Sequence, residues 1–215
     1  MGRAPPTGLR HRGPSMDAIE LAIALAVGIG LAAAAGFRVF VPLLALGLAA
    51  RAEYLPLAEN LQWLASTPAL LALATATVLE LGGYYVPWLD NALDSLATPA
   101  AIIAGTILTA SVLTDVDPLL RWALGLIAGG GSAAAVQLTT VATRAASTLT
   151  TAGVANPAVS TAEAGASAVM SALAIFIPVL AILLLVALLV LMWRVARRGR
   201  RRRALRNGGG DHSTP

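Results

Sequence analysis

Cysteine is absent from this sequence, and histidine occurs only as His11 and His212, close to the two ends. The first absence excludes disulfide bonds, thiolate metal sites and cysteine nucleophiles. The second excludes a histidine-based active site within the body of the chain. Motifs typical of zinc proteases, phosphate-binding loops and serine hydrolases are also missing. We therefore expect a protein that is not an enzyme and that uses no metal and no cofactor.

Charged residues are scarce as well. They make up 12% of the chain, about half the share in an average soluble domain. Hydrophobic residues make up 57%, and the mean hydropathy is +0.76. A soluble protein this apolar could not cover its own surface with polar groups. The composition therefore predicts an integral membrane protein.

Hydrophobic runs poor in charge predict an all-α, polytopic membrane helical bundle of about six segments. We expect these segments at residues 18–35, 39–50, 67–86, 98–113, 119–143 and 168–193. The second is short, because 12 residues at 1.5 Å each reach only ~18 Å of a hydrocarbon core ~30 Å thick. It is expected to be either half of a re-entrant hairpin or a tilted span that uses its flanking residues.

Residues 144–166 are small and polar, and Asn156 is followed by Pro157. Non-helical backbone at membrane depth persists only where protein or a water-filled cavity surrounds it. This stretch is therefore expected to be an external loop or a re-entrant element.

The chain is expected to have three parts. Residues 1–15 combine Pro, Gly and Arg without apolar periodicity, which indicates a disordered arm or a start-site artefact ahead of Met16. The transmembrane helical domain is expected at 16–193, and a disordered, basic cytoplasmic tail at 194–215.

The charge distribution predicts an orientation. Residues 194–215 hold eight arginines and one acid, whereas residues 16–193 hold four arginines and ten acids. The positive-inside rule places the arginine-rich tail in the cytoplasm, where it anchors the topology or binds anionic lipid headgroups. An even count of six segments then places both termini in the cytoplasm, in the inner membrane of a bacterium. The aromatic residues expected at the interfaces are Trp63, Trp122 and Trp193 on the inner side, and Tyr84, Tyr85 and Trp88 on the outer side.

Ionisable residues inside a membrane are costly and are therefore functional candidates. Glu80 lies within the third segment and Arg38 lies between the first two. The six-segment topology brings both toward the outer leaflet, so we expect them to interact. The pair would be either a structural ion pair or part of a solute or proton site. Glu163 and Asn156, from the polar stretch, complete the predicted substrate-binding set.

Three further patterns each have two interpretations. Asp90 and Asp94 stand four residues apart, which indicates a cation-attracting pair or a solvated helix face. The glycine run at 129–131 predicts a helix break that frees carbonyl groups, or close packing of helices. The sequence VFVPLL at 39–44 resembles IFIPVL at 175–180, through internal duplication or through chance.

Several stretches together resemble a known family. They are AAAAGFRVFVPLL at 32–44, Glu80 with YYVPWLDN at 84–91, and GVANPAVSTAE at 153–163. The sequence resembles the bacterial multi-pass membrane-protein family catalogued as domain of unknown function 4126, over residues 17–193. The resemblance implies a multi-pass helical protein and implies no established activity.

The leading functional hypothesis therefore depends on the residues themselves. The interrupted second segment, the polar stretch and the intramembrane charges favour a small-solute or ion transporter of the permease type. The alternative is a non-transporting membrane scaffold or assembly partner. The expected partner is the lipid bilayer, with anionic headgroups at the arginine tail. Association into a homo-oligomer is a further possibility, and no nucleic-acid partner is expected.

Overall fold

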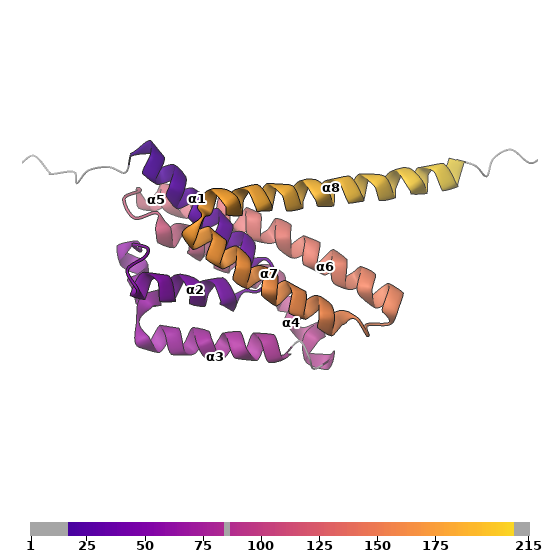
Figure 1. Ribbon diagram of the computed structural model, residues 1–215, viewed down its shortest axis with the longest axis horizontal. Coiled ribbons are helices and arrows are strands. Elements are labelled where there is room, and N and C mark those ends of the chain that lie inside the picture. Colours follow the sequence, from indigo (N-terminus) through magenta and orange to yellow (C-terminus); the bar gives the residue numbers. More distant parts are fainter. Residues whose placement is uncertain (1–16, 84–86, 209–215) are drawn as a thin grey trace, which may run out of the picture.

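The structure is a computed structural model that describes the backbone of residues 17–83 and 87–208, with side chains except at 87–95, 196 and 198–208. Every regular element in these residues is helical (Figure 1). The elements are α1 Ala18–Ala35, α2 Phe40–Arg51, the 3₁₀-helix η1 Glu59–Ala65, α3 Thr67–Gly83, α4 Pro87–Val112, α5 Pro118–Leu124, the π-helix η2 Gly125–Gly130, α6 Gly131–Thr151, α7 Asn156–Phe176 and α8 Pro178–Gly208. The predicted all-α membrane bundle is confirmed.

The short second segment is also confirmed, because α2 has only 12 residues. With α1 it forms a hairpin whose turn, residues 36–39, lies inside the bundle rather than at its surface. Arg38 in this turn is 1% exposed. The turn therefore introduces a polar backbone and a charged side chain into the protein interior.

The polar stretch at 144–166 is mostly helical, which corrects the expected loop or re-entrant element. α6 continues to Thr151, residues 152–155 make a turn, and α7 begins at Asn156. The hydroxyl groups of Thr143, Thr150 and Thr151 each donate to a backbone carbonyl four residues earlier. Because these bonds satisfy the hydroxyls within the helix, a Ser/Thr-rich sequence is compatible with a helix here.

The expected last segment, 168–193, is divided between two helices. α7 ends at Phe176, and Pro178 is the first residue of α8. Proline lacks an N–H group and cannot continue a helix without losing a backbone hydrogen bond, whereas it is well suited to a first turn. α8 then runs through the start of the arginine-rich tail to Gly208.

The two similar sequences noted above have the same place in the fold. Residues 39–44 open α2, with Pro42 as its third residue, and residues 175–180 contain Pro178 at the start of α8. Each lies at a break between two helices. Helix initiation next to proline therefore accounts for the similarity without a duplication.

Four helical stretches in the described residues are long and apolar enough to cross a membrane: 18–35, 118–151, 156–176 and 178–195. A fifth is counted if η1 and α3, bent by 62°, form one span. In Figure 1 the start of α1, the end of α2 and the start of α5 lie at one end of the bundle. The end of α3, the α6–α7 turn and the end of α8 lie at the other. The first helix thus begins, and the last helix ends, at opposite ends of the bundle.

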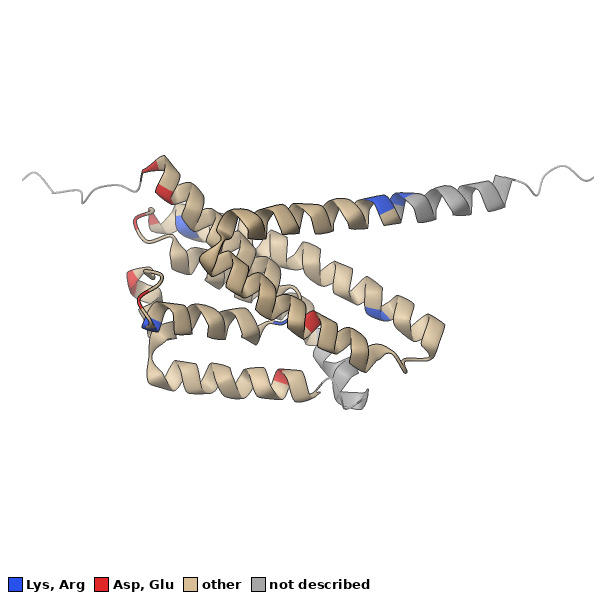
Figure 2. Cartoon of the chain, in the orientation of Figure 1, with Lys and Arg blue, Asp and Glu red and all other residues tan. Residues whose placement is uncertain are grey.

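The two ends differ in charge (Figure 2). One end, here called the acidic end, carries exposed acids on the start of α1, on the 51–59 connection and on the 113–117 connection. These acids are Asp17, Glu20, Glu53, Glu59, Asp115 and Asp117. The opposite end, here called the basic end, carries Arg194 and Arg197 of α8.

α1 lies at the centre of the bundle and packs against α4, α6, α7 and α8. Small residues allow this close approach. A Cβ added at Gly28 would lie 2.9 Å from the Cα of Thr109 in α4, and one added at Gly30 would lie 2.8 Å from the Cβ of Ala174 in α7. The backbone of α1 consequently lies in near contact with α4 and α7 at these positions.

The glycine run at 129–131 has the same packing role, and it does not interrupt the helical path from α5 to α6. A Cβ at Gly129 would overlap the Gly105 carbonyl and the Thr109 hydroxyl of α4, whereas a Cβ at Gly131 would meet nothing within 4 Å. Gly129→Ala is therefore expected to lower the free energy of unfolding by about 1–3 kcal/mol.

Gly131→Ala is the matched control, two residues away in the same helical run. It is expected to leave stability unchanged or to raise it by up to about 1 kcal/mol, because alanine favours helix over glycine. Thermal unfolding of both variants in detergent measures the difference. Equal destabilisation by the two substitutions would contradict the packing role of Gly129.

Candidate functional site

The α1–α2 turn is held in place by close packing on α6. A Cβ at Gly36 would lie 2.6 Å from both the Ala133 carbonyl oxygen and the Val136 Cβ. The hydroxyl of Ser167, from α7, donates to the Ala34 carbonyl at the end of α1, over 2.9 Å. α6 and α7 therefore fix the backbone on either side of Arg38.

Arg38 binds a carboxylate from α7. Its Nη2 donates to Glu163 Oε2 over 3.1 Å and to the backbone carbonyl of Ser160 over 3.0 Å. Arg144, from α6, binds the same carboxylate through Nε, at 3.2 Å from each oxygen, and through Nη2. Its Nη2 also donates to the Ser160 hydroxyl over 2.9 Å. Glu163 is 6% exposed and therefore joins two arginines in the protein interior.

Glu80 binds the other side of the same turn. Its Oε1 accepts from the backbone N–H of Val39 over 2.7 Å, and its Oε2 accepts from that of Phe40 over 3.1 Å. Val39 and Phe40 begin α2, which has no side-chain cap of its own. The carboxylate thus satisfies N–H groups at the positive end of the helix dipole. Glu80, in α3, caps a helix that is remote from it in sequence.

The structure gives the expected grouping of Arg38 with Glu80 a different form. Arg38 pairs with Glu163, and Glu80 binds the backbone immediately after Arg38. The side chain of Glu80 caps the start of α2, and the sequence analysis did not predict this contact. The two residues still belong to one cluster, because Glu80 binds the backbone N–H groups of the two residues that follow Arg38.

Arg144 is the residue that the predicted site lacked. It lies seven residues before the end of α6, and Glu163 lies seven residues after the start of α7. In two antiparallel helices joined by a short turn, residues equally far from that turn lie at the same level. The pairing would therefore have followed from the sequence if 144–166 had been interpreted as a helical hairpin.

Asn156 does not reach the cluster. It opens α7 and its Nδ2 donates to the Thr148 hydroxyl of α6 over 3.3 Å, across the α6–α7 turn. This turn uses two left-handed residues, Ala152 (φ 52°) and Gly153 (φ 84°). Asn156 therefore closes the hairpin that aligns Arg144 with Glu163. The side chains of Asp90 and Asp94 lie outside the described residues.

The arginine–glutamate cluster, defined as Arg38, Glu80, Arg144 and Glu163, is made of groups that a membrane interior accepts only when paired. Each is less than 10% exposed. The cluster joins the α1–α2 turn, α3, α6 and α7. Among the residues that the structure describes, no three of His, Asp or Glu come together as they would to hold a metal ion.

Three cavities lie away from this cluster. One of about 350 Å³ is lined by Glu20 and Asp115 at the acidic end, and one of about 520 Å³ lies beside it near Glu53. The third, of about 400 Å³, lies between α2 and α7, where Tyr54 and Phe176 pack edge to face with ring centroids 5.6 Å apart. The cluster residues line none of these three.

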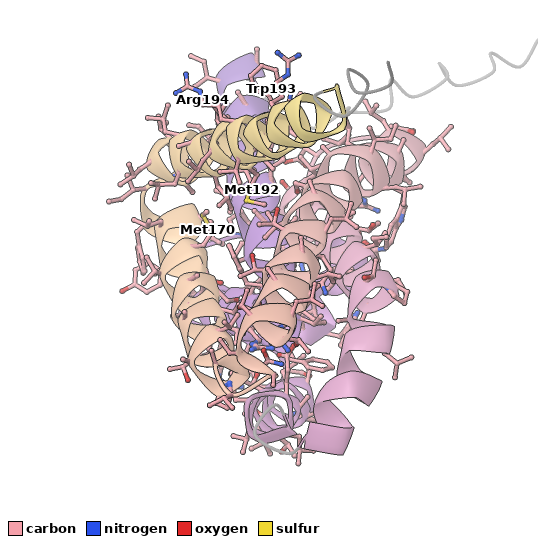
Figure 3. All side chains as sticks on the ribbon, turned by 90° about the vertical axis from the view of Figure 1, so that its right-hand side faces the viewer. Met170, Met192, Trp193 and Arg194 are labelled. Carbon is pink, nitrogen blue, oxygen red and sulfur yellow. The ribbon has the colours of Figure 1, made fainter. Side chains whose placement is uncertain are left out.

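α8 adds little to the cluster, because it lies along one side of the bundle. Figure 3 shows Trp193 and Arg194 pointing away from the other helices and Met192 pointing toward them. Trp193 is 54% exposed, and the guanidinium of Arg197 lies 3.8 Å from its ring centroid. This end of α8 thus has an aromatic and cationic surface typical of a membrane interface.

Comparison with curated proteins finds no match, and comparison with solved structures finds none either. A family model described as domain of unknown function (DUF4126) matches residues 25–198. These residues include the α1–α2 turn, α3, α6 and α7, and therefore the whole arginine–glutamate cluster. The multi-pass helical architecture, the buried cluster and this match agree that the chain is a membrane protein belonging to the DUF4126 family.

Proposed function

We propose that this protein is a small-solute or ion permease in which the arginine–glutamate cluster forms the polar site at membrane depth. The observation that carries the proposal is the burial of Arg38, Arg144, Glu163 and Glu80 around a helix break within an apolar bundle. Intramembrane charges of this kind are typical of solute, ion and proton pathways. The proposal assigns the protein no catalytic reaction.

The helix break supports a permease because it gives the site a polar backbone as well as charged side chains. Many secondary transporters bind their substrates where a membrane helix is interrupted and the start of a half-helix is available. In this structure the start of the short helix α2 is occupied by the Glu80 carboxylate. A substrate would bind by replacing internal partners such as this carboxylate, and it would replace these hydrogen bonds one after another.

The opposite placement of the chain ends supports a revised orientation. The polar stretch and the break at Pro178 give three spans after residue 117, where the sequence analysis counted two. With the arginines of α8 in the cytoplasm, the basic end is cytoplasmic and the acidic end, with the start of α1, faces out. This replaces the proposal that both termini are cytoplasmic. Bacterial inner-membrane localisation and binding of anionic lipid by the tail stay part of the proposal.

Reporter fusions test this orientation. A reporter fused after Gly208 is expected to give a cytoplasmic signal, and one fused before Asp17 a periplasmic signal. A fusion within the 152–155 turn is expected to be cytoplasmic and provides the internal control. Cytoplasmic signals from both chain ends would contradict this orientation.

The alternative, a scaffold without transport, is favoured by one specific observation. Glu163 accepts from both arginines at once, which is the pattern of a structural junction between α1, α6 and α7. Contacts such as Gly28 on Thr109 also leave no space between the helices. A scaffold would use the cluster only to hold the bundle together.

Purified protein in liposomes distinguishes the two functions. Uptake of protons, inorganic ions and small charged solutes is measured for the natural chain and for Glu163→Gln, with Glu59→Gln, an exposed acid, as the matched control. A permease is expected to show flux that Glu163→Gln reduces at least about tenfold and Glu59→Gln leaves unchanged. Correctly folded protein without flux of any of these probes would support the scaffold instead.

A further inference from the structure

A buried arginine remote from the cluster has no partner among the residues that the structure describes. Arg121, in α5 at the acidic end, is 9% exposed. Its Nε is fully enclosed, and among the described residues its guanidinium makes no hydrogen bond and no ion pair. An enclosed N–H donor without a hydrogen-bond partner is unfavourable, and the charge beside it needs a compensating group. The partner is therefore expected to come from outside the chain.

The acids closest to Arg121 in sequence are engaged elsewhere. Asp117 lies one helical turn earlier, but its Oδ1 accepts from the backbone N–H groups of Leu119 and Leu120, over 2.9 and 3.4 Å. Asp115 accepts from the Thr114 hydroxyl over 3.2 Å. Both carboxylates are exposed. They therefore add negative charge to the surface near Arg121 but form no ion pair with it.

The surroundings of Arg121 place it at the depth of lipid headgroups. α5 begins at the exposed Asp117 and presents Leu119, 81% exposed, and Trp122, 39% exposed, to the outside. Arg121 follows Asp117 by about 6 Å of helix rise. Helical side chains point toward the N-terminus of their helix, so the guanidinium is directed back toward the membrane surface. Arginine near a helix end commonly extends to the interface in this way.

We propose that Arg121 binds the phosphate of a zwitterionic phospholipid headgroup that carries a free ammonium group, such as phosphatidylethanolamine. The planar guanidinium matches phosphate oxygens and forms strong, charge-assisted hydrogen bonds with them. The neighbouring exposed acids Glu20, Asp115 and Asp117 repel a headgroup with net negative charge and attract an ammonium group. The site is thus distinct from the arginine tail, which lies at the other end of the bundle and favours anionic lipid.

Native mass spectrometry of the full chain, released from detergent with added lipid, tests this site. Phosphatidylethanolamine, phosphatidylglycerol and inorganic phosphate are titrated separately. The natural chain is expected to bind phosphatidylethanolamine more tightly than phosphatidylglycerol. Arg121→Gln is expected to weaken binding of phosphatidylethanolamine at least about tenfold, the equivalent of losing one charged hydrogen bond. Arg51→Gln, an exposed arginine at the same end that donates to Thr67, is the control and is expected to change nothing.

Three results would overturn the proposal. Undiminished binding of phosphatidylethanolamine by Arg121→Gln would show that Arg121 does not hold the headgroup. Equal or tighter binding of phosphatidylglycerol by the natural chain would reject the zwitterionic lipid. Displacement of lipid by an equal concentration of inorganic phosphate would assign the site to a free anion. If Arg121→Gln does not fold, Arg121→Lys is used, and it is expected to bind less tightly than the natural chain because lysine cannot form the two-point contact.

Discussion

Replacing Glu163 with alanine is expected to lower the free energy of unfolding by about 3–5 kcal/mol, because a buried ion pair that loses one member leaves an uncompensated charge. Here one carboxylate serves both Arg38 and Arg144, so its removal affects the α1–α2 turn, α6 and α7 together. Unfolding in detergent, followed by heat or by denaturant, measures the loss.

A double-mutant cycle shows whether the loss comes from the pairing. Glu163→Ala and Arg144→Ala together are expected to cost less than the sum of the single substitutions, with a coupling of about 0.5–3 kcal/mol. Glu59→Ala removes an exposed acid of η1 and is expected to change stability by no more than about 0.5 kcal/mol. Additive effects of the two cluster substitutions would reject Glu163 as the junction.

Glu80→Ala is expected to lower the free energy of unfolding by about 3 kcal/mol, because two backbone N–H groups at the start of α2 lose a charged acceptor. No water is present in a lipid environment to replace it. Glu80→Gln retains one amide oxygen as an acceptor and is expected to lose about half as much. The measurement is again unfolding in detergent.

Comparison of two cycles tests whether Glu80 acts on the backbone rather than on Arg38. The coupling between Arg38→Ala and Glu80→Ala is expected to be smaller than that between Arg38→Ala and Glu163→Ala. A larger coupling for the Glu80 cycle would show that the direct ion pair expected from the sequence dominates after all. If Glu80→Gln matched Glu80→Ala in full, the cap on α2 would be contradicted.

The sequence predicted the class of fold and most of the charged residues that meet in the interior. Composition and apolar runs are sufficient for a membrane bundle, and the cost of an intramembrane charge directs attention to Arg38, Glu80 and Glu163. The partners were not predicted, because two arginines and two glutamates allow several pairings as long as the helix ends are unknown. Which pairing forms depends on the level of each residue along its helix, and that level depends on where the helices turn.

The orientation that we now propose differs from the predicted one for a related reason. The interpretation of 144–166 treated Ser and Thr as loop residues, although their hydroxyls bond within the helix. It also treated 168–193 as one helix across Pro178. Together the two interpretations gave two helices after residue 117, whereas the structure has three. Because each crossing reverses the side of the membrane, this one helix changes the side proposed for the N-terminal half. Asn156 was predicted to bind substrate, whereas in the structure it closes the α6–α7 turn.

Arg144 and Glu163 lie at the same height in neighbouring helices, and this has a consequence for biosynthesis. Alone in lipid, an arginine or an acid within a helix carries an insertion cost that reaches roughly 2.5–3.5 kcal/mol at the helix centre. α6 and α7 are separated by only four residues, so their opposite charges come within reach of each other as soon as both helices have left the ribosome. Residues 118–176 should therefore stay at the translocon until both helices are present and then enter the bilayer as a pair. If the ribosome is stalled between the two helices, α6 should not integrate into the membrane.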